Sequence, residues 1–352
     1  MNTNLNKLRF IAFIFCLIAF QATSALSQIA PKPPPPPKPK IAEKSLPRVR
    51  VFPPKPPMPR EYGGDTEKSI LVDGKVKVQL CVLEGNLKIN GWDRNEIRVF
   101  VKDGSRIGFN VIEKSRKNGS PVWIEISGAE TAKNQPKQSN ECLHGDAIEI
   151  DVPRNASINV KGRETKTRID SVRKAVVKIS GGDISLRNIA EGIEAITYEG
   201  DVTVENSSGA FSLESATGNI LAFEVSPSEI GDIFRAKTTN GAIALQNLEH
   251  RQIEVNSISG SISFNGDLLN GASYNFGTSN GVINLAIPAD SSCKITASYG
   301  FGGFNSEIPI NKIIENKSSS GQNIVGIMGD GDATLNLTTA SGAIRIRNKN
   351  KK

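Results

Sequence analysis

Histidine is scarce in this chain, whose 352 residues include only His144 and His250. Catalytic triads and zinc sites commonly depend on histidine placed near nucleophiles or other metal ligands. Both histidines lie in polar segments, with no nucleophile motif or metal-ligand spacing around them. We therefore expect two solvated surface histidines, no metal site and no cofactor.

Clustered acids and consecutive calcium-binding repeats are also lacking. Polysaccharide lyases and hydrolases built on β-helices need acids or bases gathered on one outer face. Here the outward strand positions mix Ser, Thr, Asn, Lys, Arg and Glu. The single run Gly329-Asp330-Gly331-Asp332 has no neighbouring copies, so we interpret it as a turn. The sequence thus favours a protein that is not an enzyme, with a polysaccharide-active β-helix lyase or hydrolase as the alternative.

Long apolar runs are absent beyond residue 20, and no later segment approaches 18 consecutive apolar residues. The run Phe10–Phe20 follows Lys7 and Arg9 and precedes several small residues, which is the layout of a signal peptide. It is shorter than the roughly 20 residues that a membrane-spanning helix needs. Cys16 lacks the preceding small residues of a lipid-attachment site. We predict a signal peptide over residues 1–27 and an exported protein that is periplasmic, cell-surface or secreted.

The formal net charge of +7 is confined to the N-terminal part of the chain. Residues 1–27 hold two basic residues, and residues 28–60 hold eight basic residues and one acid. The remainder then carries 33 basic and 35 acidic residues, so the body is nearly neutral. Nucleic-acid binders carry clustered Lys and Arg on the folded surface that meets phosphate. This distribution excludes nucleic acid as the expected partner.

Thirteen of the 19 prolines lie between Pro31 and Pro59, interleaved with lysine and arginine. Proline lacks an amide donor and has a fixed φ, so such a segment favours an extended polyproline conformation. We predict that residues 28–60 form a disordered linker rich in proline and lysine. It is either a solvated spacer or an arm whose positive charges bind an anionic envelope polymer or lipid headgroups.

One 12-residue pattern recurs from about residue 158 to the end of the chain. It reads apolar, any, apolar, any, Ser or Thr, two more, Gly, any, apolar, any, apolar, as in IEVNSISGSISF from Ile253. Successive copies start about 20 residues apart, and a repeat of this length predicts a β-solenoid. The glycines that we expect to form turns are Gly182, Gly200, Gly218, Gly241, Gly260, Gly281, Gly300 and Gly342.

The pattern also predicts the structure of each coil. Apolar residues two apart form strands with one buried face, and the glycine turns the chain by positive φ or allows close backbone approach. Hydroxyl residues at the fifth position should satisfy backbone groups at turns, in preference to forming a ligand-binding stripe. The copy starting at Ile158 has Thr165 in place of glycine and is a candidate first coil. We assign residues 156–347 to the solenoid and 348–352 to a basic tail.

Two regions depart from the repeat. Residues 61–155 contain alternating strands without the strict period, and we expect this N-terminal β region to cap the open end of the solenoid. Between Phe304 and Asp332 the pattern nearly disappears, which favours an excursion such as a hairpin or mobile loop. The long final interval, from Cys293 to Leu335, is interpreted as two turns of the solenoid.

Three cysteines remain after the predicted signal peptide. Cys293 occupies an inward position of its coil and is expected to be a buried apolar residue. Cys81 and Cys142 either pair as a disulfide in an oxidising compartment or are two separate buried thiols. The sequence leaves both alternatives open.

Three features in order resemble the putative-adhesin family of bacterial β-strand-repeat proteins of unknown function. They are GNLKINGWDRNEIRVFV from Gly85, IEIDVPRNASINV from Ile148, and the S/T-x-N/S-G-x-I-x-L units that follow. The resemblance covers about residues 65–347. It implies a right-handed, single-stranded parallel β-helix at the cell envelope, with no established catalytic residues.

The expected function is therefore non-catalytic. An exported β-solenoid would present an extended surface for adhesion or cell-envelope interaction, with a surface glycan or a protein as its partner. A weaker alternative is a signalling component whose repeats contact a membrane protein. The sequence alone does not identify the ligand.

Overall fold

A computed structural model describes residues 64–129, 141–318 and 321–351. All the described residues lie in the unit Pro59–Lys352. The predicted signal peptide lies outside the described residues, as does the predicted linker. Within the described ranges, every regular element is a β-strand, which confirms the all-β prediction.

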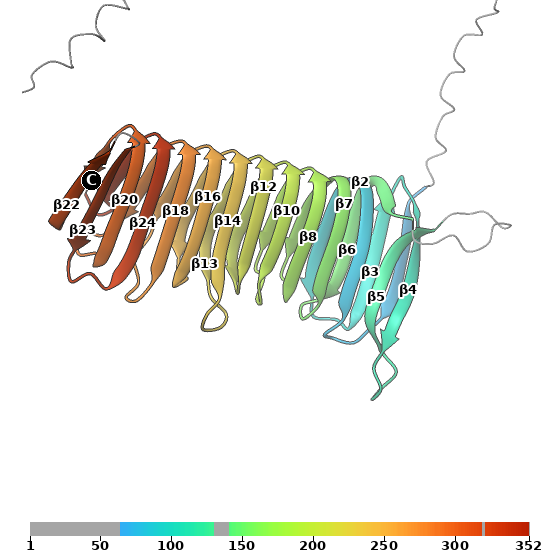
Figure 1. The fold of residues 1–352 in the computed structure, drawn as a ribbon. Coiled ribbons are helices and arrows are strands. Elements are labelled where there is room, and N and C mark those ends of the chain that lie inside the picture. The colour runs from blue at the N-terminus through green and yellow to red at the C-terminus, as the bar shows by residue number, and fades with distance from the viewer. Residues whose placement is uncertain (1–63, 130–140, 319–320, 352) are drawn as a thin grey trace, which may run out of the picture. The chain divides into compact units, whose positions relative to one another are not determined.

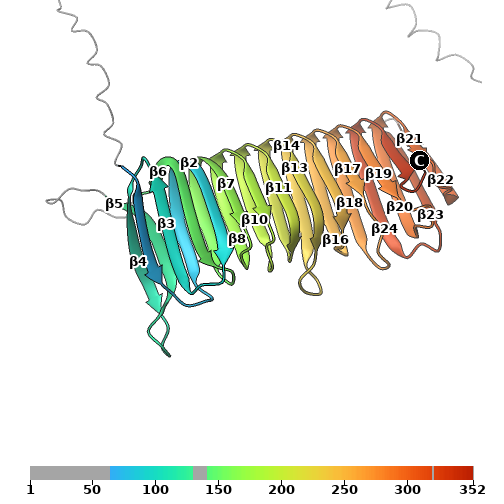
Figure 2. The ribbon, with the colours of Figure 1, turned by 180° about the vertical axis from the view of Figure 1, so that it is seen from behind.

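Parallel strands stack side by side in two rows, as seen from the two sides in Figures 1 and 2. Two long strands, β2 (Lys77–Trp92) and β7 (Ser157–Asp170), contribute their first halves to one row and their second halves to the other. We call these the first row and the second row. Each central coil of the solenoid supplies one strand to each row.

The first row follows a fixed order through space. It runs β4 (Arg106–Lys114), β5 (Pro121–Ala129), β2, β7, β8 (Lys174–Gly181), β10 (Ile193–Glu199), β12 (Phe211–Thr217), β14 (Ile233–Asn240), β16 (Gln252–Ser259), β18 (Ser273–Asn280), β24 (Ala333–Ser341), β20 (Cys293–Phe301), β23 (Gly321–Met328) and β22 (Asn311–Ser318).

The second row lies behind it. It runs β1 (Thr66–Leu71), β3 (Glu96–Lys102), β6 (Leu143–Pro153), β2, β7, β9 (Ile184–Arg187), β11 (Val202–Ser208), β13 (Ile220–Ser226), β15 (Ile243–Leu248), β17 (Ile262–Asn265), β19 (Ile283–Ile287), β25 (Ile344–Asn348) and β21 (Phe304–Ser306).

The core is a set of apolar ladders between the two rows, and this confirms the β-solenoid prediction. Residues at one pattern position lie directly over each other in register, because successive coils pair in parallel. The first pattern position illustrates this. Its buried column, in spatial order, is Val78, Ile158, Ala175, Ile193, Phe211, Phe234, Ile253, Tyr274, Leu335 and Ile295.

The glycine column marks where the coils approach most closely. A Cβ atom built on Gly241 would lie 2.0 Å from the carbonyl oxygen of Gly218, and one on Gly260 would lie 1.8 Å from that of Gly241. Gly200 and Gly218 additionally have positive φ angles of 137° and 152°. A side chain added at these glycines would collide with the backbone of the neighbouring coil, whereas the coil at Ile158 has Thr165 in this column.

One predicted turn glycine is misplaced. Phe301 pairs with Ser341, so Gly302 and not Gly300 stands level with Gly342. A Cβ atom on Gly302 would lie 1.9 Å from the Gly342 carbonyl oxygen, as the column requires. Gly300 lies inside strand β20, because this copy starts two residues later than the sequence pattern suggested.

The last coil in sequence is not the last coil in space. Strand β24 pairs with β18 on one side and β20 on the other, and β25 lies between β19 and β21. The interpretation of the final interval as two turns is therefore wrong. Strands β22 (Asn311–Ser318) and β23 (Gly321–Met328) instead pair antiparallel, and β23 pairs with β20, which confirms the predicted excursion.

The N-terminal end has a similar arrangement. Strand β2 is a full coil, with Gly85 level with Thr165 and Leu87 level with Thr167. The coil at Ile158 is therefore not the first. Beyond β2, strands β5 and β6 pair with its two halves, and antiparallel β4, β3 and β1 cover them. Both rows thus finish in antiparallel strands at the N-terminal end, whereas at the C-terminal end the first row does so and the second row finishes in the parallel strand β21.

Candidate binding groove

The outward side of the first row is hollowed along much of its length. Three hollows of about 510, 380 and 790 Å³ follow one another from β8 to β23. Lys237 lines the first two, and Thr278, Ser279 and Thr338 line the second and third. Adjacent hollows share lining residues, so they form one row that crosses the strands. We call it the first-row groove.

The chemistry of this groove changes along its length. At the N-terminal side it contains Glu214 and Lys237, and the neighbouring outward pair Lys178 and Glu194 is joined by a 2.7 Å ion pair. Strands β18 and β24 contain no charged residue at all. From β16 to β24 the groove is lined mainly by amide and hydroxyl side chains. Its middle part is therefore polar and nearly uncharged.

A notch at Gly277 deepens the middle hollow. Asn256 and Asn275 flank it, and the Asn336 side-chain amide donates a 2.7 Å hydrogen bond to Asn275 Oδ1. A Cβ atom on Gly277 would lie 2.8 Å from Asn256 Oδ1. Gly277 is level with Asn256 on one neighbouring strand and with Thr338 on the other, and the Asn256 side chain reaches into the space that a side chain at Gly277 would fill.

Three exposed apolar side chains lie along the groove. Tyr198 is 67% exposed and lines the first hollow, Ile258 is 50% exposed and lines the second, and Phe301 is 84% exposed and lines the third. The groove therefore combines polar side chains with apolar surfaces spaced along it, which is the usual make-up of a ligand site.

The buried hydroxyl column beneath the groove has a structural role, which confirms the prediction made for it. Thr238 donates a 3.0 Å hydrogen bond to the Gly218 carbonyl, and Thr278 donates a 2.9 Å bond to that of Gly260. The same bond is made by Thr197, Ser215, Ser257 and Thr339. These hydroxyls satisfy the carbonyl groups of the glycine column and are not free to bind a ligand.

A protein-family model matches residues 73–347, which is most of the chain and includes the whole groove. The chain belongs to the Toastrack DUF4097 family. This confirms the resemblance inferred from the sequence. A search of the curated proteins finds no match.

Three solved structures are similar to this Toastrack chain. A putative cell adhesion protein from Clostridium sporogenes is 14% identical, over 81% of this chain and 100% of that one, with a TM-score of 0.22. From Parabacteroides distasonis, a putative adhesin is 10% identical (81% and 98% covered, TM-score 0.33) and a putative lipid binding protein is 9% identical (81% and 97%, TM-score 0.31). At these TM-scores the names of those proteins carry no argument about what this one binds.

Among residues 64–129, 141–318 and 321–351, no three His, Cys, Asp or Glu side chains gather as a metal site. No helix in this part of the Toastrack chain is long and apolar enough to cross a membrane. The Gly329–Asp332 segment is a turn, as predicted: the Ser292 hydroxyl accepts hydrogen bonds from the backbone N–H groups of Asp330, Gly331 and Asp332.

His250 is buried, so the prediction of a solvated surface histidine is wrong for it. Its side chain is 0% exposed and packs against Phe211 and Phe234, with ring centroids 5.3 and 5.9 Å away. Its Nε2 donates a 2.8 Å hydrogen bond to the Gly209 carbonyl, while Nδ1 is buried without a described partner. Burial lowers the pKa of His250, although the Gly209 hydrogen bond and the charges of Asp232 and Glu249 partly oppose the shift.

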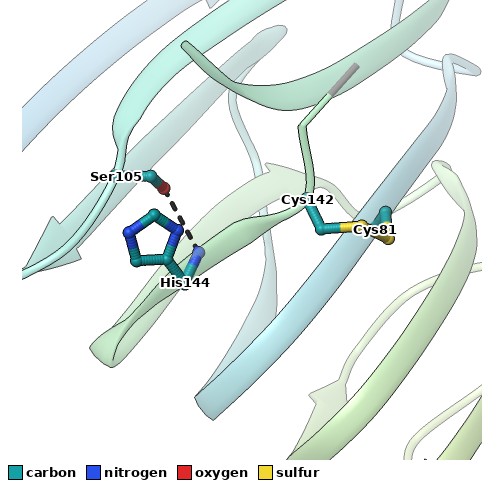
Figure 3. Close-up of a disulfide and its surroundings, with 4 residues drawn as sticks. All are labelled: Cys81, Ser105, Cys142 and His144. Atoms are coloured by element: carbon teal, nitrogen blue, oxygen red, sulfur yellow. Dashed lines mark hydrogen bonds between the residues drawn. A yellow bond between two sulfur atoms is a disulfide. The ribbon is translucent and has the colours of Figure 1, made fainter. Parts of the chain in front are cut away.

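His144 lies in β6, near the N-terminal end of the solenoid, and is half-buried. Its backbone N–H donates a 3.2 Å hydrogen bond to the Ser105 hydroxyl (Figure 3). Close by, Cys81 of β2 and Cys142, which directly precedes β6, are joined in a disulfide, with Cα atoms 4.6 Å apart. We propose that this bond forms in the exported protein and ties the N-terminal cap to the first full coil.

Alkylation tests the cysteine assignment. Cys293 is a free, buried thiol whose pKa is raised by burial to about 11, so it should not react in the native protein. In protein lacking residues 1–27, we expect Cys293 alone to be labelled after denaturation without reductant, and all three cysteines after reduction. Mass analysis that finds Cys81 and Cys142 labelled without reductant would refute the disulfide.

The buried His250 predicts a loss of stability in mild acid. The unfolded chain binds a proton at this residue with a pKa near 6.5, whereas the folded pKa is lower. Below about pH 6.5 the unfolded state therefore holds more protons, and the unfolding free energy should fall by up to about 1.4 kcal/mol per pH unit until the folded pKa is passed. Denaturant titrations from pH 7.5 downward should show a flatter dependence for His250→Gln than for wild type. His144→Gln is the matched control, and an unchanged slope in His250→Gln would contradict the assignment.

Proposed function

We propose that this protein is an exported, non-catalytic β-solenoid that presents an extended surface for adhesion or cell-envelope interaction. The observation that carries the proposal is the first-row groove, which continues across adjacent coils and is lined by polar, largely uncharged side chains. A groove of this length suits a long ligand better than a small substrate enclosed at a single point.

The alternative of a polysaccharide-cleaving enzyme is less well supported. Glycoside hydrolysis usually needs two carboxyl groups about 5–9.5 Å apart, on either side of the bond that is cleaved. The three described hollows of the groove contain one carboxylate, that of Glu214. Lys237, lining the same first hollow, is a cation and supplies no second carboxyl.

Export and attachment form the second part of the proposal. Residues 1–27 have the layout of a signal peptide, and residues 28–60 combine prolines with eight basic residues. We propose that the first segment directs export. The second is a spacer whose charges also bind an anionic envelope polymer or lipid headgroups, and that binding would weaken as salt rises.

Fractionation and binding experiments test this function together. When the full chain is expressed, the protein should be recovered outside the cytoplasm and without its N-terminal segment. The purified mature protein should bind envelope fractions. Incubation with a panel of polysaccharides, with and without calcium, should release no shortened products. Cytoplasmic retention, or mature protein that binds no envelope fraction, would contradict the proposal. Reproducible cleavage that is lost in Glu214→Gln would favour the enzyme instead.

A further inference from the structure

We infer that the first-row groove binds an extended, uncharged glycan that runs across the strands from Tyr198 to Phe301. This inference rests on the proposed non-catalytic function and adds the chemical class of the ligand and its position. It follows from the charge of the groove, its spacing and the apolar side chains along it.

The lining of the groove matches a ligand rich in hydroxyl groups. Amide and hydroxyl side chains each offer both donors and acceptors, as sugar hydroxyls do. Asn256, Asn275 and Thr338 supply such groups in the middle hollow, where β18 and β24 carry no charge. A strongly anionic polymer would need cations along its path, and the three hollows contain only Lys237, with Glu214 beside it in the first.

The length of the groove and the distance between its strands suit a linear polymer. Tyr198 lies in β10 and Phe301 in β20, and β12, β14, β16, β18 and β24 lie between them (Figure 1). Six steps of about 4.8 Å give a length of about 29 Å. One step is comparable to the length of one hexose unit in an extended glycan, so about six sugar units would lie over similar positions on successive coils.

The exposed apolar side chains provide surfaces for the sugar rings. Tyr198 and Phe301 lie near the two ends of the groove and Ile258 lies between them, each at least half exposed. Aromatic rings bury a large apolar area when a flat ligand packs against them, and sugar rings have apolar C–H faces. The polar side chains would then determine the orientation of the chain.

An extended peptide fits this surface less well. Peptides that add to a sheet do so at an edge, where backbone N–H and C=O groups are free. Strands β16, β18 and β24 are each paired on both sides, so the groove lies on a sheet face. On a sheet face, the backbone N–H and C=O groups of a peptide could form hydrogen bonds only with separate side chains of the groove.

Titration calorimetry with neutral oligosaccharides of increasing length tests the inference. The probes are β-1,4-glucan, β-1,3-glucan and chitin oligomers, with polygalacturonate and an unstructured neutral peptide as competitors. For at least one neutral series, affinity should rise with length up to about six units and then level off. Tyr198→Ala and Phe301→Ala should each weaken binding about tenfold, which is about 1.4 kcal/mol. Gly277→Gln, which fills the notch, should weaken it further.

Two variants outside the groove serve as matched controls. Ile230→Ala truncates a fully exposed side chain in the loop between β13 and β14, and Asn284→Ala removes an outward amide from β19 in the second row. Both should leave affinity unchanged, and thermal unfolding should show that all variants are folded.

The inference is overturned if no neutral glycan binds, if the groove variants bind as wild type does, or if the peptide displaces the glycan. Envelope binding that is lost only on deleting residues 28–60 would leave the proposed function intact while refuting the groove as the site.

Discussion

Close approach of backbone at the glycine column is the constraint on which this structure depends. Carbonyl oxygens of one coil lie where a Cβ atom on the glycine of the next coil would sit, so a side chain added at these glycines would collide with them. Hydroxyls at the fifth pattern position bond those same carbonyls. Together they fix the coils in one register, and the outward side chains are therefore aligned as well. The first-row groove is a consequence of that alignment, since each of its hollows is built from several coils.

Local periodicity predicted the repeating part of the fold because each coil encodes its own inward positions. The order of the coils at the C-terminal end could not be obtained in this way. The observed order β18–β24–β20 and the sequential order β18–β20–β24 would bury equivalent apolar ladders. The choice between them therefore depends on long-range pairing. The coil formed by β2, in contrast, could have been predicted from the sequence. The segment VQLCVLEGNLKI from Val78 follows the 12-residue pattern, with Val82 replacing the hydroxyl residue.

His250 and the groove show two further limits of the sequence. His250 follows β15, in which the buried positions change from Ile243 and Leu245 to Leu248 beyond Asn247, whose φ is 52°. The simple alternation of the strand therefore did not indicate that His250 is buried. The groove has no sequence signal either, because its Asn, Ser and Thr residues are ordinary outward strand residues. Only the stacking of strands β10 to β20 brings Tyr198, Gly277 and Phe301 onto one continuous surface. Antiparallel strands cover both rows at the N-terminal end and the first row at the C-terminal end, which limits the length of exposed parallel edges.

The free energies of unfolding of Gly241→Ala and Gly303→Ala test whether the structure depends on close backbone approach at the glycine column. Neither glycine has a positive φ, so the two variants differ mainly in what the added Cβ meets. At Gly241 it would lie 2.0 Å from the Gly218 carbonyl oxygen, whereas nothing lies within 4 Å at Gly303. We expect Gly241→Ala to lower the free energy of unfolding by about 1–3 kcal/mol or more. Gly303→Ala should change it by no more than about 0.5 kcal/mol. Equal stabilities of the two variants would contradict the dependence on close approach.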